Sequence, residues 1–144
     1  MFLLLKTLFS HFNYGIYPFI TSSNTLPYGA CSLGFPPQVI RHIYGAAKIY
    51  DTRSGFDDEF PESLLEDIEL QKVGDVGQEY GTTTGRRRKV NWLNLNKLIH
   101  AINVSGTTHI VISKNDVLVD LNIFKIILFN SKLSLSDNST LNHT

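Results

Sequence analysis

Four cations follow a turn of glycine and threonine in the stretch EYGTTTGRRRKVNW, residues 79–92. The basic residues 86–89 come directly after Gly85, and three threonines precede that glycine. An arginine guanidinium matches carboxylate and phosphate oxygens with paired hydrogen bonds, and a Gly-Thr turn adds N–H and hydroxyl donors. Each charged hydrogen bond contributes about 1.5–3 kcal/mol, so two or three arginines could anchor a multiply charged ligand. The segment is therefore either an anion site or a basic loop that faces solvent or the acidic block upstream.

A second segment that could carry chemistry is ISKNDVL, residues 112–118. Its Ser-Lys-X-Asp at the end of a β-branched run is similar to the guanine-reading element of GTP-binding proteins. An aspartate carboxylate accepts from both N1–H and the exocyclic amine of guanine, and the lysine stem can lie along the base. The competing interpretation is a strand-end turn with ordinary polar residues. The sequence contains no GxxxxGK[ST] loop, which excludes a standard P-loop GTPase.

The composition fits one globular domain that carries no overall charge. The chain has 144 residues, of which 42% are hydrophobic and 18% charged. Lys+Arg and Asp+Glu both total 13, so no global field attracts nucleic acid or an anionic membrane. RNA binding through the basic run is disfavoured further, because no stacking aromatic residues interleave with the cations. We expect neither nucleic acid nor a membrane as a partner.

Cysteine and histidine usage limits the chemistry in two more ways. The single cysteine, Cys31, excludes an intrachain disulfide framework and fits a reducing compartment, so we expect a cytoplasmic protein. The five histidines show no metal-ligand spacing, and we predict no metal site from them. The apolar run at residues 1–9 lacks signal-peptide features and is too short to span a bilayer. We interpret it as a buried strand.

The spacing of apolar residues predicts elements of a mixed α/β fold. Two prolines, Pro36 and Pro37, mark a helix start, and apolar residues then recur at three-and-four spacing as far as Tyr50. This pattern predicts a helix over about 36–50. Downstream of an acidic loop, a short helix is expected around 62–70.

The carboxy-terminal half alternates between helix and strand patterns. Trp92, Leu95 and Ile99 share one helical face, which predicts a helix from about 92 to 103. Two runs rich in β-branched and aromatic residues predict strands at about 109–113 and 123–129. The remaining residues, 130–144, are rich in serine, asparagine and leucine without periodicity, and we expect a disordered tail.

Five longer segments extend both motifs into one collinear pattern. In chain order they are GIYPFITSSNT, LGFPPQVIRHIYGAAKIYDTRSG, EFPESL, QEYGTTTGRRRKVNWLNL and SKNDVL. Their order and residues resemble the adenylosuccinate synthetase family, over residues from about 10 to 129. The resemblance implies a mixed α/β central-sheet fragment of that family's P-loop NTPase-like fold. It makes residues 1–129 a partial domain of this kind, with 130–144 as its tail.

The resemblance also implies an activity. The family joins IMP to L-aspartate with GTP and Mg²⁺, through a 6-phosphoryl-IMP intermediate, and forms adenylosuccinate on the route to AMP. Small molecules would thus be the partners of this chain, together with a second copy, since a homodimer is expected of the complete enzyme. Cations near a transferring phosphoryl group would stabilise its developing charge.

Particular residues of this sequence match the family's binding positions. Thr21 matches a threonine that contacts the IMP phosphate, and Arg86 lies at a second IMP-contacting position. Arg88 matches an arginine near GTP. The aspartate-closing loop corresponds to Thr82, Thr83, Thr84, Gly85, Arg86, Arg87 and Arg88. The guanine-binding triplet corresponds to Lys114, Asn115 and Asp116.

The family's phosphate loop, Mg²⁺ ligands, catalytic aspartate and histidine acid precede the matched segments. We therefore predict no catalytic residue and no metal ligand in this chain, and no turnover by it alone. Three interpretations stay open: a fragment of a GTP-dependent ligase, one part of a ligase assembled from split chains, or a non-catalytic nucleotide-binding or interaction module.

Overall fold

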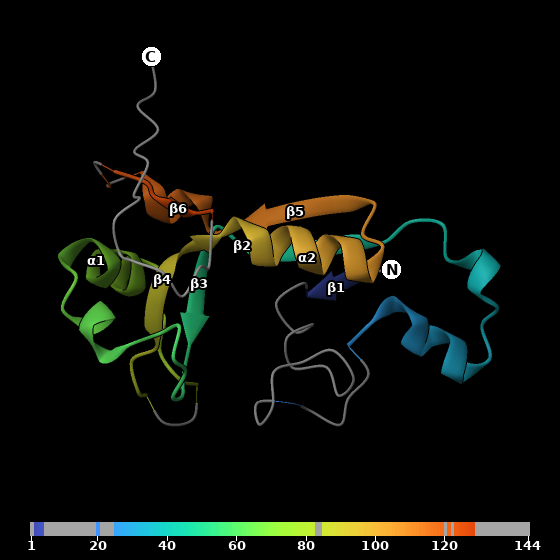
Figure 1. Ribbon diagram of the computed structural model, residues 1–144, viewed down its shortest axis with the longest axis horizontal. Coiled ribbons are helices and arrows are strands. Elements are labelled where there is room, and N and C mark those ends of the chain that lie inside the picture. Colours follow the sequence, from blue (N-terminus) through green and yellow to red (C-terminus); the bar gives the residue numbers. More distant parts are fainter. Residues whose placement is uncertain are drawn as a thin grey trace, which may run out of the picture. The chain divides into compact units, whose positions relative to one another are not determined.

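A computed structural model describes residues 2–4, 20, 25–82, 85–119, 121 and 123–128 of the chain. The chain divides into two compact units, each with one three-stranded sheet (Figure 1). The first unit comprises Met1–Ala47 and Lys97–Ser113, and the second comprises Lys48–Asn96 and Lys114–Thr144.

The sheet of the first unit has the strand order β1-β2-β5. Strand β1 (Phe2–Leu4) pairs in parallel with β2 (Tyr44–Lys48), and β5 (His109–Ser113) is the other neighbour of β2. Along β2, buried residues alternate with half-buried ones, as expected of a strand with one covered face. Just before β2, the backbone N–H of Ile43 donates to the Thr108 hydroxyl at 3.0 Å. The N–H of Thr108 donates in return to the Ile43 carbonyl at 2.9 Å, which fixes the start of β2 against that of β5.

Prolines and a glycine set the boundaries of the short helices in this unit. The 3-10 helices η2 (Pro27–Leu33) and η3 (Pro37–Val39) both begin with proline, whose fixed φ suits the first turn. Helix η2 ends at Gly34, which has a φ of 93° in the left-handed region. Helix α2 (Leu95–Ser105) is the only long helix described in this unit, and it buries Leu98, Ala101 and Ser105.

The second unit is built around strand β4 (Lys89–Asn94), the centre of the sheet β3-β4-β6. Strand β3 (Tyr50–Arg53) is antiparallel to β4, with Tyr50 opposite Trp92. Strand β6 (Ile126–Ile127) is parallel to β4, with Ile126 opposite Leu93. Because β4 has neighbours on both edges, nearly all its residues are buried.

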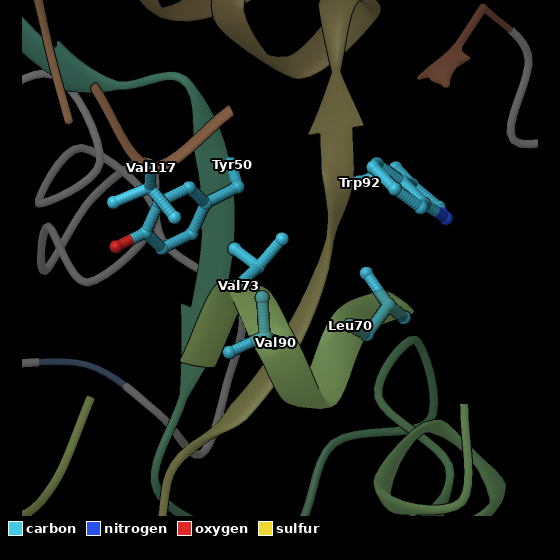
Figure 2. Close-up of a cluster of buried hydrophobic side chains, with 6 residues drawn as sticks. All are labelled: Tyr50, Leu70, Val73, Val90, Trp92 and Val117. Carbon is cyan, nitrogen blue, oxygen red and sulfur yellow. The ribbon is translucent and has the colours of Figure 1, made fainter. Parts of the chain in front are cut away.

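One apolar cluster joins this sheet to its helices (Figure 2). Helix α1 (Ile68–Val76) starts at Asp67, whose carboxylate accepts from the N–H groups of Glu69 and Leu70. The cluster also receives Val117 from the 3-10 helix η5 (Asn115–Leu118), while η4 (Glu62–Leu65) precedes α1. Its buried members are Tyr50, Leu70, Val73, Val90, Trp92 and Val117.

The prediction of a helix over 36–50 is wrong. Only Pro37–Val39 is helical there, and the remainder supplies β2 and the first residue of β3. Ile43 and Ala47, which suggested a helical stripe, lie four residues apart, and this spacing keeps two side chains on one side of either a helix or a strand. The structure buries Ile43, Gly45 and Ala47 in alternation, but glycine at the middle position gives no hydrophobic signal.

The other predicted elements are closer to the structure. The strand at 109–113 is confirmed as β5, and the start of the chain is confirmed as a strand at Phe2–Leu4. The helix predicted from 92 starts at Leu95, because Trp92 lies within β4, which ends at Asn94. The helix expected around 62–70 is divided into η4 and α1, and the strand expected over 123–129 is reduced to Ile126–Ile127 among the residues described there. The domain limits 1–129 and the tail 130–144 stay predictions, since residues 129–144 lie outside the described part.

Candidate nucleotide and substrate site

The arginine-containing segment folds back on itself between α1 and β4. The N–H of Arg88 donates to the Glu79 carbonyl at 2.9 Å, and the N–H of Gly81 donates to the Arg86 carbonyl at 2.8 Å. Gly85 has a φ of 63°, a conformation that glycine adopts without steric cost. Of the threonines predicted to bind aspartate, the structure describes Thr82, which lies in this loop. Thr82 is exposed, while Thr83 and Thr84 lie outside the described residues, as does Thr21.

The basic run does not act as one charged patch. Arg87 points to α1, where its guanidinium donates to the Gln71 carbonyl and pairs with Asp75, both at 2.8 Å. Lys89 is buried in β4 and its ammonium donates to the Phe60 carbonyl at 3.0 Å. The same ammonium lies 2.5 Å from a Glu62 carboxylate oxygen. These two cations therefore fasten the loop to the fold, whereas the side chain of Arg86 is exposed.

The third arginine faces a buried carboxylate. Glu79 is 3% exposed, and one of its oxygens accepts from the Lys48 ammonium at 2.5 Å and from the Tyr50 hydroxyl at 2.7 Å. Its other oxygen lies 3.5 Å from the Arg88 guanidinium. Burial by itself would raise the pKa of Glu79, but the hydrogen bonds from Lys48 and Tyr50 and the nearby positive charges outweigh burial and lower this pKa. Glu79 is therefore an anion at neutral pH.

Tyr50 stays protonated beside this anion. Burial is the main cause that raises the pKa of its phenol far above the usual range, followed by the hydrogen bond to Glu79. The negative charges of Glu79 and Asp116 act in the same direction. The hydroxyl is thus a permanent donor to the carboxylate.

The predicted guanine triplet follows directly after β5. Lys114 has a φ of 64°, and its ammonium donates to the Gly77 carbonyl at 3.0 Å. Asn115 and Asp116 are exposed at the start of η5, which Val117 anchors in the apolar cluster. Gly77 ends α1 two residues ahead of Glu79. The triplet, through Lys114, and the arginine loop, through Arg88, are therefore both attached to the short segment that follows α1 in the second unit.

The structure thus gathers Arg88, Lys114 and Asp116 around the Tyr50–Glu79 pair, while Arg87 is engaged elsewhere. Sequence reasoning missed Lys48, Tyr50 and Glu79 as members of the site. Lys48 and Tyr50 contact the same oxygen, yet residues two apart lie on different sides of a helix. The wrong helix over 36–50 therefore hid this pair. Glu79 is the first residue of the segment 79–92, and the only feature of the sequence that could have indicated its role is an acidic residue ahead of a basic run.

Within the residues that the structure describes, no three or more His, Cys, Asp or Glu side chains gather to hold a metal ion. No helix in the same part of the chain is long and apolar enough to cross a membrane.

The fold is similar to that of a solved enzyme structure. The fully ligated adenylosuccinate synthetase from Plasmodium falciparum matches with a TM-score of 0.70 and 33% sequence identity, over 79% of this chain and 27% of that one. The mixed α/β fold of this chain is therefore similar to part of that enzyme. The chain belongs to the adenylosuccinate synthetase family, whose model matches residues 6–132.

Curated relatives agree with this assignment. An adenylosuccinate synthetase of Christiangramia forsetii is 42% identical over 115 residues, and one of Trichoplax adhaerens is 46% identical over 107 residues. These matches cover 79% and 74% of this chain, but 27% and 24% of the relatives. The chain thus spans about a quarter of the length of the curated relatives it matches.

Proposed function

We propose that this chain carries substrate-binding elements of an adenylosuccinate synthetase, the GTP-dependent ligase that joins IMP and L-aspartate in purine nucleotide synthesis. The observation that carries the proposal is the common anchoring of Arg88 and Lys114. Arg88 pairs with Glu79, and Lys114 donates to the carbonyl of Gly77 in the same short segment. Arg88, which is suited to phosphate, and Asp116, which follows Lys114 by two residues and is suited to guanine, are thereby held in one compact unit.

The arginine loop would bind the two anionic substrates. Arg86 is exposed beside the flexible-backbone position Gly85, and its guanidinium can pair with an aspartate carboxylate or the IMP phosphate. Hydroxyl and N–H donors of Thr82, Thr83 and Thr84 would complete the aspartate contacts, and Thr21 would contact the IMP phosphate.

The triplet after β5 would bind guanine. Asp116 is exposed and can accept from N1–H and the exocyclic amine together, while the stem of Lys114 offers an apolar surface to the base. Asn115 would border the base, and Arg88 would meet the phosphate-bearing part of GTP.

Mg²⁺ and a homodimer complete the proposal at the level of the whole enzyme. Mg²⁺ would neutralise charge on the GTP phosphates, with ligands that the described residues do not gather. Because the chain matches about a quarter of its relatives' length, binding rather than turnover is the appropriate measurement.

Calorimetric titration with GTP, ITP and XTP tests the guanine assignment. ITP lacks the exocyclic amine and XTP carries a carbonyl in its place, so the unsubstituted chain should prefer GTP. The variant Asp116→Asn can donate its amide N–H to that carbonyl and should prefer XTP. Asp58→Asn, an equal charge change at an exposed loop position, serves as the control. Failure of the unsubstituted chain to bind GTP at millimolar concentration would reject the proposal.

IMP binding provides a separate test of the loop. Arg86→Ala should abolish most of the calorimetric signal for IMP, since a phosphate loses its bidentate partner. IMP affinity that survives this change would show that Arg86 is wrongly assigned.

A further inference from the structure

Glu79 is the convergence point of cations from separate segments. Lys48 lies at the end of β2 and Arg88 lies just before β4, yet both reach this one carboxylate. The Glu79 side chain is 4% exposed. One of its carboxylate oxygens contacts Lys48 and Tyr50, and the other faces Arg88. A buried anion with this set of partners restricts the positions that each partner can adopt.

Arg88 is only partly used by this contact. Its side chain is 32% exposed, and it meets Glu79 through one terminal nitrogen at 3.5 Å. The guanidinium has five N–H donors in a planar fork, so the ion pair leaves donors for a second anion. Glu79 thus directs Arg88 without consuming its capacity for ligands.

Glu79 is also connected to the predicted guanine triplet, through Tyr50 and Gly77. Lys114 donates to the carbonyl of Gly77, and the Tyr50 hydroxyl is packed so closely on Gly77 that an added Cβ would lie 2.3 Å from it. Tyr50 in turn donates to Glu79. The path from Arg88 through Glu79, Tyr50 and Gly77 to Lys114 is therefore continuous, and each step is an ion pair, a hydrogen bond or a packing contact within one unit.

We propose that Glu79 is a positioning residue for nucleoside triphosphate binding, which holds Arg88 at a fixed place relative to Lys114. This inference rests on the proposed function, in which both cations contact GTP. Glu79 itself would touch no part of the ligand.

The direction in which GTP affinity changes when Glu79 is neutralised distinguishes a positioning role from a purely electrostatic effect. Glu79 is an anion near a site for an anionic ligand, so by Coulomb's law alone its neutralisation should tighten GTP binding. If Glu79 instead fixes Arg88, its neutralisation releases the guanidinium and should weaken GTP binding.

The experiment titrates the full chain with GTP by calorimetry. Glu79→Gln keeps the shape of the side chain, and we expect it to weaken GTP binding about tenfold, on the order of one charged hydrogen bond. Glu62→Gln is the matched control, because it removes the same charge from another lysine-paired glutamate of this unit. In an Arg88→Ala background, Glu79→Gln should cause no further loss, since the residue to be positioned is gone.

Fluorescence of Trp92, the single tryptophan, reports whether each variant is folded. If Glu79→Gln does not fold, Lys48→Met is combined with it, which removes the cation left without its partner, and the pair is compared with Lys48→Met alone. Unchanged or tighter GTP binding on loss of Glu79 overturns the inference, as does a loss that persists without Arg88. Absence of GTP binding by the unsubstituted chain would instead overturn the proposed function, and the inference with it.

Discussion

The Tyr50 hydroxyl donates a 2.7 Å hydrogen bond to the carboxylate of Glu79, and both side chains are buried. The bond connects the first residue of β3 to the residue that opens the arginine loop. A change at this pair should therefore affect the stability of the sheet and the order of the loop together.

Tyr50→Phe tests the stabilising part of that bond. The ring still fills the core, but Glu79 loses one of its donors, which should lower the free energy of unfolding by about 1–3 kcal/mol. Urea denaturation followed by Trp92 fluorescence measures the change. Tyr80→Phe is the control, because Tyr80 makes a similar 2.8 Å bond to Asp75 at an exposed site. An equal effect of both substitutions would contradict a special role for the buried pair.

The acid side of the stability profile should depend on Glu79. Its pKa is lowered in the folded chain, relative to about 4.3 in an unfolded chain. The stabilisation is hence complete above the unfolded pKa and is lost as pH falls through the lower, folded pKa. Glu79→Gln should flatten the fall in urea midpoint below about pH 4.3. Parallel acid profiles of the two proteins would refute this assignment.

Gly77→Ala should be among the most damaging glycine substitutions in the second unit. An added Cβ would lie 2.3 Å from the Tyr50 hydroxyl oxygen and 2.8 Å from the Val73 carbonyl oxygen. Overpacking of this kind costs about 1–3 kcal/mol, and here it also displaces the donor to Glu79. Gly55→Ala, where no heavy atom lies within 4 Å, should leave the melting temperature nearly unchanged.

The residue after Gly77 should respond in the opposite direction. Gln78 has a φ of 52°, in the left-handed region where a helix usually places glycine after its last turn. Gln78→Gly should therefore raise the free energy of unfolding by about 1 kcal/mol. Thermal melting measures this gain, and a loss of stability would mean that the Gln78 side chain makes compensating contacts.

Neighbouring arginines should separate into a structural and a binding role. Arg87→Ala removes the contacts to Gln71 and Asp75 in α1, so the main effect should be a lower urea midpoint. Arg86→Ala, at an exposed side chain, should lower the midpoint less than Arg87→Ala does, while weakening IMP binding. A reversed pattern in the two assays would overturn the division.

The sequence contained enough information for elements whose pattern is local. Helix α2 has apolar residues at helical spacing along one face, and β5 is a run of β-branched residues, so both could be predicted closely. The strands between Pro37 and Arg53 could not be predicted. Ile43 and Ala47 fit the repeat of a helix as well as that of a strand, and Gly45 between them gives no hydrophobic signal. Strand pairing between Tyr50 and Trp92, which decides the matter, is a long-range contact.

The candidate site shows the same division. Arg88, Lys114 and Asp116 stand in short motifs whose chemistry can be read from residue type alone. Lys48 and Tyr50 precede Glu79 by about thirty residues, and only the folded chain brings them to its carboxylate. A single glutamate has no periodicity from which such partners could be inferred.

The parallel pairing of β4 with β6 has a consequence for how the protein is made. Leu93 and Asn94 find their partners in Ile126 and Ile127, which leave the ribosome much later. At 5–20 residues per second, one edge of β4 stays open for on the order of seconds after the strand has been synthesised. During that interval a nascent chain has an unpaired strand edge next to apolar side chains such as those of Trp92 and Leu93, which is the kind of surface that promotes aggregation.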